Sequence, residues 1–155
     1  MIWYMEKSVN IFWVPLGAIL VALCIYLTPL KHIALVEPKP YDIEPQTFYN
    51  DFTKNPDKYI FIDVRGPSIY DVAHAKGSIN QPIGSLFDGH RQLPRRDKTI
   101  VLICSSGRLA GVAYGFLENL GFMNLARVKG GVQAWAVAGL PLEGNNIHAA
   151  IPTAD

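Results

Sequence analysis

One stretch of the chain, residues 99–111, restricts the possible folds more than any other. It begins with the apolar, β-branched run Thr99–Ile103, passes through Cys104 into a loop of serine and glycine, and continues as an amphipathic segment from Leu109 to Leu120. This order predicts a buried parallel strand, a tight loop and a helix. The backbone N–H groups of such a loop, together with the helix N-terminus, favour a thiolate and a neighbouring anion. The stretch therefore indicates a nucleophilic cysteine that meets an anionic or sulfur-bearing partner.

The segments on either side of this stretch alternate between strand and helix patterns. We expect helices over residues 44–53, 67–73, 84–92, 109–120 and 131–138, and strands over residues 59–64, 77–80, 99–103 and 125–128. Such alternation predicts an α/β domain over residues 41–143, with a mainly parallel sheet and helices on its faces. Ligands bind beyond the carboxyl ends of the strands in sheets of this kind, and Cys104 lies at that edge.

Composition excludes several classes of function. Lys and Arg number 14 and Asp and Glu 13, so we expect no nucleic-acid partner. The two cysteines, Cys24 and Cys104, do not form a disulfide framework, since Cys24 lies in an apolar segment far from the loop. The four histidines are scattered without metal-ligand spacing, so we expect no metal and no cofactor. The length of 155 residues suits one domain of ordinary size.

Residues 11–30 contain no charged side chain. This length matches the roughly 20 residues with which a helix crosses a bilayer, and Trp13 and Tyr26 lie near its ends as interfacial aromatic residues do. A cleaved signal peptide is the alternative, but its apolar core is usually shorter and no small-residue cleavage site follows Leu30. We therefore expect an uncleaved transmembrane helix over residues 11–30, after a short tail over residues 1–10.

The segments that flank the expected domain are polar or irregular. Residues 31–40 contain Glu37-Pro38-Lys39-Pro40, which predicts a stiff, extended linker. Residues 144–155 show no periodicity, and we expect a flexible tail there. Lys7 on one side of the apolar segment is balanced by Lys31 and Lys39 on the other. The sequence thus predicts a single-pass protein of the cell membrane without deciding which side carries the domain.

Four motifs, taken in order, resemble a single rhodanese domain over residues 41–143. They are Ile62-Asp63-Val64-Arg65, residues 73–80, Cys104-Ser105-Ser106-Gly107, and residues 130–141, which combine paired glycines, a tryptophan and a closing Gly-x-Pro. The resemblance implies a rhodanese-like fold around a five-stranded parallel sheet. It also implies transfer of sulfur through a cysteine persulfide, with thiosulfate or a persulfide as donor and a thiol or cyanide as acceptor.

Each residue of the loop has a role in this interpretation. Cys104 is the expected nucleophile, and the N–H groups from Ser105 to Ala110, which include those of Ser106, Gly107, Arg108 and Leu109, stabilise the anionic persulfide. The small side chains of the two serines leave the loop open, and the Arg108 side chain attracts an anionic donor. Asp63 and Arg65 end a neighbouring strand, where they either shape the site or form an ion pair that holds the next loop.

Two other functions use a similar loop. A sulfur-carrier or docking module for a membrane partner would retain the same cysteine, and the sequence identifies no protein partner. Cysteine-dependent phosphatases and arsenate reductases place an arginine at the sixth position after the cysteine, and this chain has Ala110 there. Many rhodanese loops carry an arginine at the fifth position, where this chain has Leu109. We therefore expect a membrane-tethered sulfurtransferase, although the sequence does not name its sulfur donor.

Overall fold

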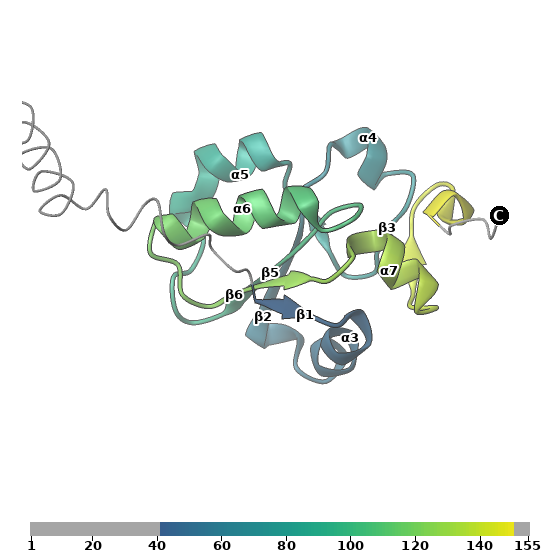
Figure 1. The fold of residues 1–155 in the computed structure, drawn as a ribbon, viewed down its shortest axis with the longest axis horizontal. Helices are drawn as coiled ribbons and strands as arrows, with labels where there is room; N and C mark the ends of the chain where they lie inside the picture. Colours follow the sequence, from purple (N-terminus) through teal and green to yellow (C-terminus); the bar gives the residue numbers. More distant parts are fainter. Residues whose placement is uncertain (1–40, 151–155) are drawn as a thin grey trace, which may run out of the picture. The chain divides into compact units, whose positions relative to one another are not determined.

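The computed structural model describes residues 41–150, and its central element is a parallel sheet (Figure 1). Its five strands lie in the order β1-β6-β5-β2-β4, and every pairing is parallel. The strands are β1 (Asp42–Ile43), β2 (Tyr59–Asp63), β4 (Ile79–Asn80), β5 (Thr99–Ile103) and β6 (Leu125–Val128). β5 lies in the middle and is buried from Ile100 to Ile103, which explains its continuous apolar run. The expected α/β fold with a five-stranded parallel sheet is confirmed.

Helices cover both faces of the sheet. They are α3 (Pro45–Lys54), α4 (Pro67–Tyr70), α5 (Ile83–Gly89), α6 (Arg108–Asn119) and α7 (Gly131–Val137), with short 3-10 turns η1 (Pro56–Lys58), η2 (His90–Gln92) and η3 (Ile147–Ala150). α5 and α6 pack together on one face, and α3 and α7 on the other. Each expected helix is present, with its ends shifted by a few residues.

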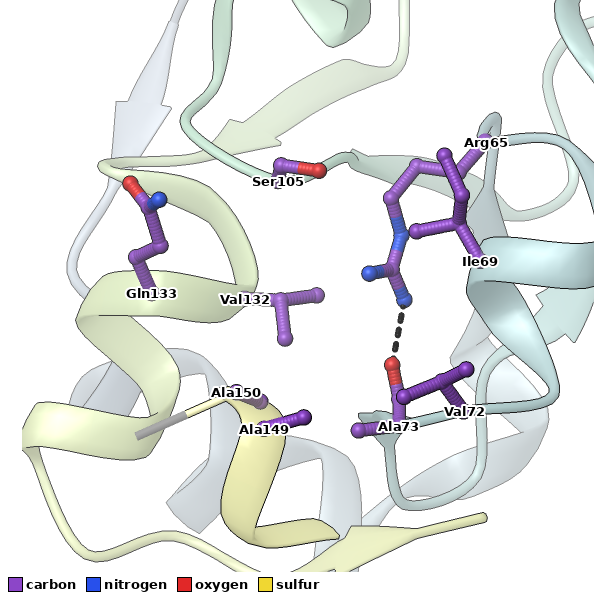
Figure 2. A pocket seen from close by; sticks show the side chains of 9 residues that line it. All are labelled: Arg65, Ile69, Val72, Ala73, Ser105, Val132, Gln133, Ala149 and Ala150. Atoms are coloured by element: carbon purple, nitrogen blue, oxygen red, sulfur yellow. Dashed lines mark hydrogen bonds between the residues drawn. The ribbon is translucent and has the colours of Figure 1, made fainter. Parts of the chain in front are cut away.

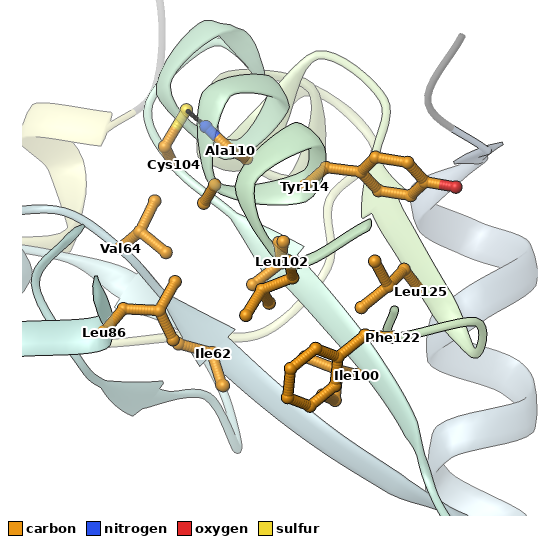
Figure 3. Close-up of a cluster of buried hydrophobic side chains, with 12 residues drawn as sticks. Ile62, Val64, Leu86, Ile100, Leu102, Cys104, Ala110, Tyr114, Phe122 and Leu125 are labelled. Carbon is orange, nitrogen blue, oxygen red and sulfur yellow. Dashed lines mark hydrogen bonds between the residues drawn. The ribbon is translucent and has the colours of Figure 1, made fainter. Parts of the chain in front are cut away.

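Two hydrophobic cores result from this layering. The core beneath α5 and α6 contains Leu102, Leu86 and Leu117, and it ends at Cys104 (Figure 3). The core beneath α3 and α7 contains Ile103, Phe48 and Trp135. Leu102 and Ile103 are consecutive and point to opposite faces because side chains alternate along a strand. β5 therefore joins the two cores and carries Cys104 at its carboxyl end.

A second, two-stranded sheet was not expected from the sequence. β3 (His74–Ala75) pairs antiparallel with β7 (Leu142–Glu143). The helix expected over residues 67–73 stops at Tyr70, and the chain then turns and enters β3 at His74. β3 and β7 show no periodicity in the sequence, so only their pairing reveals them.

Residues 144–150, expected in a flexible tail, are ordered by contacts with the loop after α4. The N–H groups of Asn145 and Asn146 donate to the carbonyls of Asp71 and Val72, each at 2.8 Å. The turn η3 follows directly. These backbone bonds join segments far apart in the sequence, which is why composition alone indicated a frayed end. Residues 151–155 lie outside the described part.

The expected transmembrane helix over residues 11–30 and the linker over residues 31–40 lie outside the described residues. Within residues 41–150, no helix is long and apolar enough to cross a membrane.

Candidate active site

Cys104 is the first residue after β5, and its thiol lies at the entrance to α6. The residue is 2% exposed, and its Sγ accepts hydrogen bonds from the backbone N–H groups of Gly107 at 3.2 Å and Ala110 at 3.3 Å. Figure 3 shows the second of these contacts, with the sulfur above the first turn of α6. Backbone donors and the helix N-terminus both stabilise negative charge at this position. The site can therefore hold a thiolate or a persulfide anion.

The turn that aims these N–H groups depends on Gly107. This residue is the N-cap of α6 and has φ of 91°, in the left-handed region that glycine adopts without strain. Its carbonyl accepts the first helical bond from Gly111 at 3.0 Å. The backbone therefore reverses at this residue and enters α6.

α7 holds the cysteine loop from the other side. The N–H groups of Val132 and Gln133 donate to the carbonyls of Cys104 and Ser105, at 2.8 and 3.0 Å. A Cβ atom on Gly131 would lie only 2.2 Å from the Cys104 carbonyl oxygen, so glycine alone permits this approach. The paired glycines of the sequence thus allow α7 to dock against the loop.

Arg127, which the sequence analysis did not single out, supports the loop from β6. Its Nη1 donates to the Gly107 carbonyl at 3.1 Å, while its Nε and Nη2 pair with the Asp42 carboxylate at 2.6 and 2.8 Å. The hydrogen bonds with Asp42 raise the pKa of Arg127 above its ordinary value, and the nearby Cys104 acts in the same direction. Only the pairing of β1 with β6 brings Asp42 and Arg127 together, so no local sequence signal identifies them.

A cavity of about 480 Å³ lies in front of the sulfur. Its walls come from the cysteine loop, the start of α6 and the segment after β2, namely Arg65, Gly66, Ile69, Cys104, Ser105, Ser106, Arg108, Leu109 and Val112. The two serines, Arg108 and Leu109 are exposed at this cavity, whereas Gly107 and Ala110 are buried and offer their N–H groups to Sγ. Ile69 and Val112, not expected at the site, add an apolar rim with exposures of 52% and 59%.

Asp63 and Arg65 form a buried ion pair beside this cavity. Arg65 Nη2 lies 2.6 Å from Asp63 Oδ2 and also donates to the Ala73 carbonyl at 2.7 Å. Asp63 is fully buried, whereas Arg65 reaches the cavity wall. The pair therefore holds the loop between β2 and β3, as one of the two interpretations proposed, and it also places a guanidinium at the site. Over residues 41–150, no cluster of three or more His, Cys, Asp or Glu side chains could hold a metal ion.

Comparisons with known families, curated proteins and solved structures match the same kind of domain. The family described as Rhodanese-like domain matches residues 44–138. Thiosulfate sulfurtransferase GlpE of Vibrio cholerae serotype O1 is 32% identical over 82 residues, which cover 53% of this chain and 76% of that protein. A rhodanese-related protein from Thermoplasma volcanium is 32% identical in its crystal structure, with a TM-score of 0.58, covering 68% of this chain and 99% of that one.

Other curated relatives are much longer than this chain. The probable adenylyltransferase/sulfurtransferase MoeZ of Mycobacterium tuberculosis is 33% identical over 81 residues, 51% of this chain but only 20% of that protein. The chain thus spans a quarter or less of the length of several curated relatives it matches.

Proposed function

The chain belongs to the rhodanese-like domain family, and on that basis we propose that it is a sulfurtransferase whose Cys104 carries sulfane sulfur from a donor to an acceptor. The position of Cys104 Sγ is the observation that supports this proposal. The sulfur accepts two backbone hydrogen bonds and faces a cavity whose charged lining side chains, within the described part of the chain, are Arg65 and Arg108. That setting suits a nucleophile that must meet anionic sulfur compounds.

In the first step the Cys104 thiolate attacks the outer sulfur of thiosulfate. A new S–S bond forms on Cys104, the S–S bond of thiosulfate breaks, and sulfite leaves with the electron pair of that bond. The negative charge that remains on the terminal sulfur of the persulfide lies in the concavity of loop N–H groups. A persulfide donor reacts in the same way, with its thiolate as the leaving group.

In the second step an acceptor attacks the terminal sulfur of the persulfide. The S–S bond on Cys104 breaks, and Cys104 leaves as a thiolate stabilised by the N–H groups of Gly107 and Ala110. Cyanide becomes thiocyanate, and a thiol acceptor becomes a persulfide. The cycle requires no external oxidant or reductant, since sulfane sulfur passes between nucleophiles.

The rim of the cavity favours a sulfur carrier as the second candidate. Ile69, Leu109 and Val112 are exposed apolar side chains around the cysteine, a surface that suits a protein-bound persulfide as well as a small anion. Phosphatase or arsenate reductase chemistry is disfavoured, because the loop position that would carry a bidentate arginine is Ala110, whose side chain is buried in the core.

The test of sulfur transfer is a mass measurement on the full chain in detergent. We expect incubation with thiosulfate to add one sulfur atom to the wild type and to the Cys24→Ser variant, but not to Cys104→Ser. Cyanide should then remove the sulfur as thiocyanate. Absence of an adduct with thiosulfate, polysulfide and a low-molecular-weight persulfide would overturn the proposal. Adduct formation without turnover to any small acceptor would favour the carrier function.

We also propose, from the sequence alone, that residues 11–30 tether the domain to a lipid bilayer. After expression, alkaline carbonate washing should leave the protein in the membrane fraction, whereas a variant that lacks residues 1–30 should be released. Protease treatment of sealed right-side-out vesicles then determines the orientation, since protection of the domain places it on the cytoplasmic side. Release of the full chain by carbonate would refute the tether.

A further inference from the structure

A second cavity adjoins the one in front of Cys104. It has a volume of about 240 Å³ and is lined by Arg65, Ile69, Val72, Ala73, Ser105, Val132, Gln133, Ala149 and Ala150 (Figure 2). Three of these residues, Arg65, Ile69 and Ser105, also line the cavity that contains the sulfur. We call the smaller space the side cavity. A ligand can therefore reach from the cysteine into the side cavity along a wall that both share.

Arg65 presents a free donor to the side cavity. The residue is only 6% exposed, and its hydrogen bonds within residues 41–150 use the backbone N–H, Nε and Nη2, with Asp63 and the Ala73 carbonyl as acceptors. Among residues 41–150, Nη1 has no hydrogen-bond partner. Figure 2 shows the guanidinium over the cavity, with the Ser105 hydroxyl directed toward it from the opposite wall. A buried arginine that keeps an unused donor beside a hydroxyl can bind an oxyanion.

The remaining walls restrict the kind of anion. Among residues 41–150, no acidic side chain lines either cavity, so the described walls do not oppose a negative ligand. Val132, Ala149 and Ala150 form an apolar floor that contacts methylene groups better than it contacts a fully hydrated ion. A short carbon chain that ends in a carboxylate matches this combination of a cationic donor, a hydroxyl and apolar walls.

We infer that the side cavity binds the carboxylate of a small thiol that accepts sulfur from Cys104. This inference rests on the proposed function. The carboxylate would bind Arg65 and Ser105, and the carbon chain would lie over Val132 toward the cysteine. The acceptor thiolate attacks the terminal sulfur of the persulfide, the S–S bond on Cys104 breaks, and the acceptor leaves as its own persulfide. Holding both ends of the acceptor lowers the entropic cost of this encounter.

Acceptor thiols of different charge test the inference, with each kcat/KM expressed per thiolate because the three thiols ionise at different pH. We expect 3-mercaptopropionate to discharge the Cys104 persulfide with a higher kcat/KM than 2-mercaptoethanol or cysteamine. Ala149 is exposed at the cavity wall, so a charge introduced there should act more strongly on an acceptor that carries a carboxylate than on an uncharged one. Ala149→Glu should reduce the ratio of kcat/KM for 3-mercaptopropionate to kcat/KM for 2-mercaptoethanol about tenfold, and Ala149→Lys should increase this ratio. Ala138→Glu, at an exposed alanine that lines neither cavity, is the matched control and should change nothing.

A binding measurement separates this inference from the proposed function. Propionate, which has no thiol, should shift the amide resonances of Val132 and Gln133 in the Cys104→Ser protein, and Ala149→Glu should abolish the shift. Equal kcat/KM values for the three thiols would overturn carboxylate binding in the side cavity, and so would a propionate response that Ala149→Glu leaves intact. Neither result would affect the proposal of sulfur transfer. Propionate binding to Cys104→Ser, together with a wild type that never forms a persulfide, would overturn sulfur transfer and retain the carboxylate site.

Discussion

At the scale of single residues, Cys104 Sγ is surrounded by backbone donors rather than by titrating side chains. Gly107 and Ala110 contribute N–H groups, and their direction depends on where the loop backbone is held. Arg127 holds it by donating to the Gly107 carbonyl. A residue that never reaches the substrate cavity can therefore influence the reaction through the geometry of the loop.

The first prediction concerns Arg127 as a positioning residue. Arg127→Met removes the bond to Gly107 and the pair with Asp42, so the loop N–H groups are no longer held against the sulfur. We expect kcat for thiosulfate:cyanide transfer to fall about tenfold with little change in KM, because the arginine does not line the substrate cavity. Arg127→Lys, which retains the charge, should recover part of the loss. Steady-state kinetics on the full chain measures both effects.

The matched control for Arg127 is Lys129→Met. Lys129 pairs with Glu44 at 2.6 Å between the same two segments, but both partners are exposed and neither contacts the loop. Its removal should leave kcat and KM unchanged, since an exposed ion pair contributes little. Equal kcat values for Arg127→Met and wild type would contradict a positioning role.

At the scale of elements, the docking of α7 on the cysteine loop determines the shape of the site. The close approach occurs at Gly131, where φ is +63° and the nearest atom to an added Cβ is the Cys104 carbonyl oxygen. Backbone hydrogen bonds from Val132 and Gln133 then secure the loop. A side chain at position 131 would force α7 and the cysteine loop apart.

The second prediction follows from this contact. Gly131→Ala should destabilise the protein by about 3 kcal/mol or more, because the steric clash adds to the strain of a positive φ. Gly139→Ala isolates the strain, since Gly139 has φ of +66° with open space around it, and should cost about 1 kcal/mol. Urea denaturation followed by circular dichroism measures the difference. An equal decrease in the free energy of unfolding for Gly131→Ala and Gly139→Ala would mean that the steric clash between α7 and the cysteine loop adds nothing.

The third prediction concerns the contact between α3 and β2. The Tyr59 hydroxyl donates to the Asp51 carboxylate, and this hydrogen bond raises the pKa of Tyr59 from 10.0 to about 12. The unfolded tyrosine loses its proton first, so the associated stability is complete below pH 10.0 and is lost as the pH rises toward about 12. Tyr59→Phe should lack this alkaline loss. Urea denaturation midpoints of both proteins, measured below pH 10.0 and near pH 12, test this prediction, and tyrosinate absorbance checks the titration of Tyr59. The same pH dependence of stability in wild type and Tyr59→Phe would contradict it.

At the scale of the whole molecule, the two cores share one central strand. Leu102 and Ile103 are fully buried, one in each core, so neither layer can unfold without disturbing β5. The described residues belong to a single compact unit. We therefore expect both cores and the active-site loop to unfold together.

The fourth prediction tests that coupling. Leu102→Ala and Ile103→Ala should each destabilise the domain by about 2–5 kcal/mol and shift one common unfolding transition. Val137→Ala, at a residue that is 72% exposed, is the control and should change stability by less than about 0.5 kcal/mol. Differential scanning calorimetry detects the transitions. Two separate heat-absorption peaks in either core variant would show that the layers unfold independently.

Local patterns in the sequence were sufficient to predict most of the elements and the position of the cysteine. The apolar run before Cys104 and the glycine-rich loop after it determine a strand, a turn and a helix through preferences that act over a few residues. The same patterns failed for β1, β3 and β7, which are two residues long, and for the tail bonded to the loop after α4. Strands this short form only where a partner is already in place.

The sequence by itself determined that a parallel α/β domain presents one cysteine in a loop of backbone donors, because burial, turn geometry and helix formation are local properties. Tertiary structure alone decided what surrounds that cysteine. Arg127 reaches Gly107 only after β1 and β6 pair, and the side cavity exists only because residues 149 and 150 return to Arg65 and Ser105. Contacts between distant segments depend on how the whole chain packs, and no window of the sequence contains them.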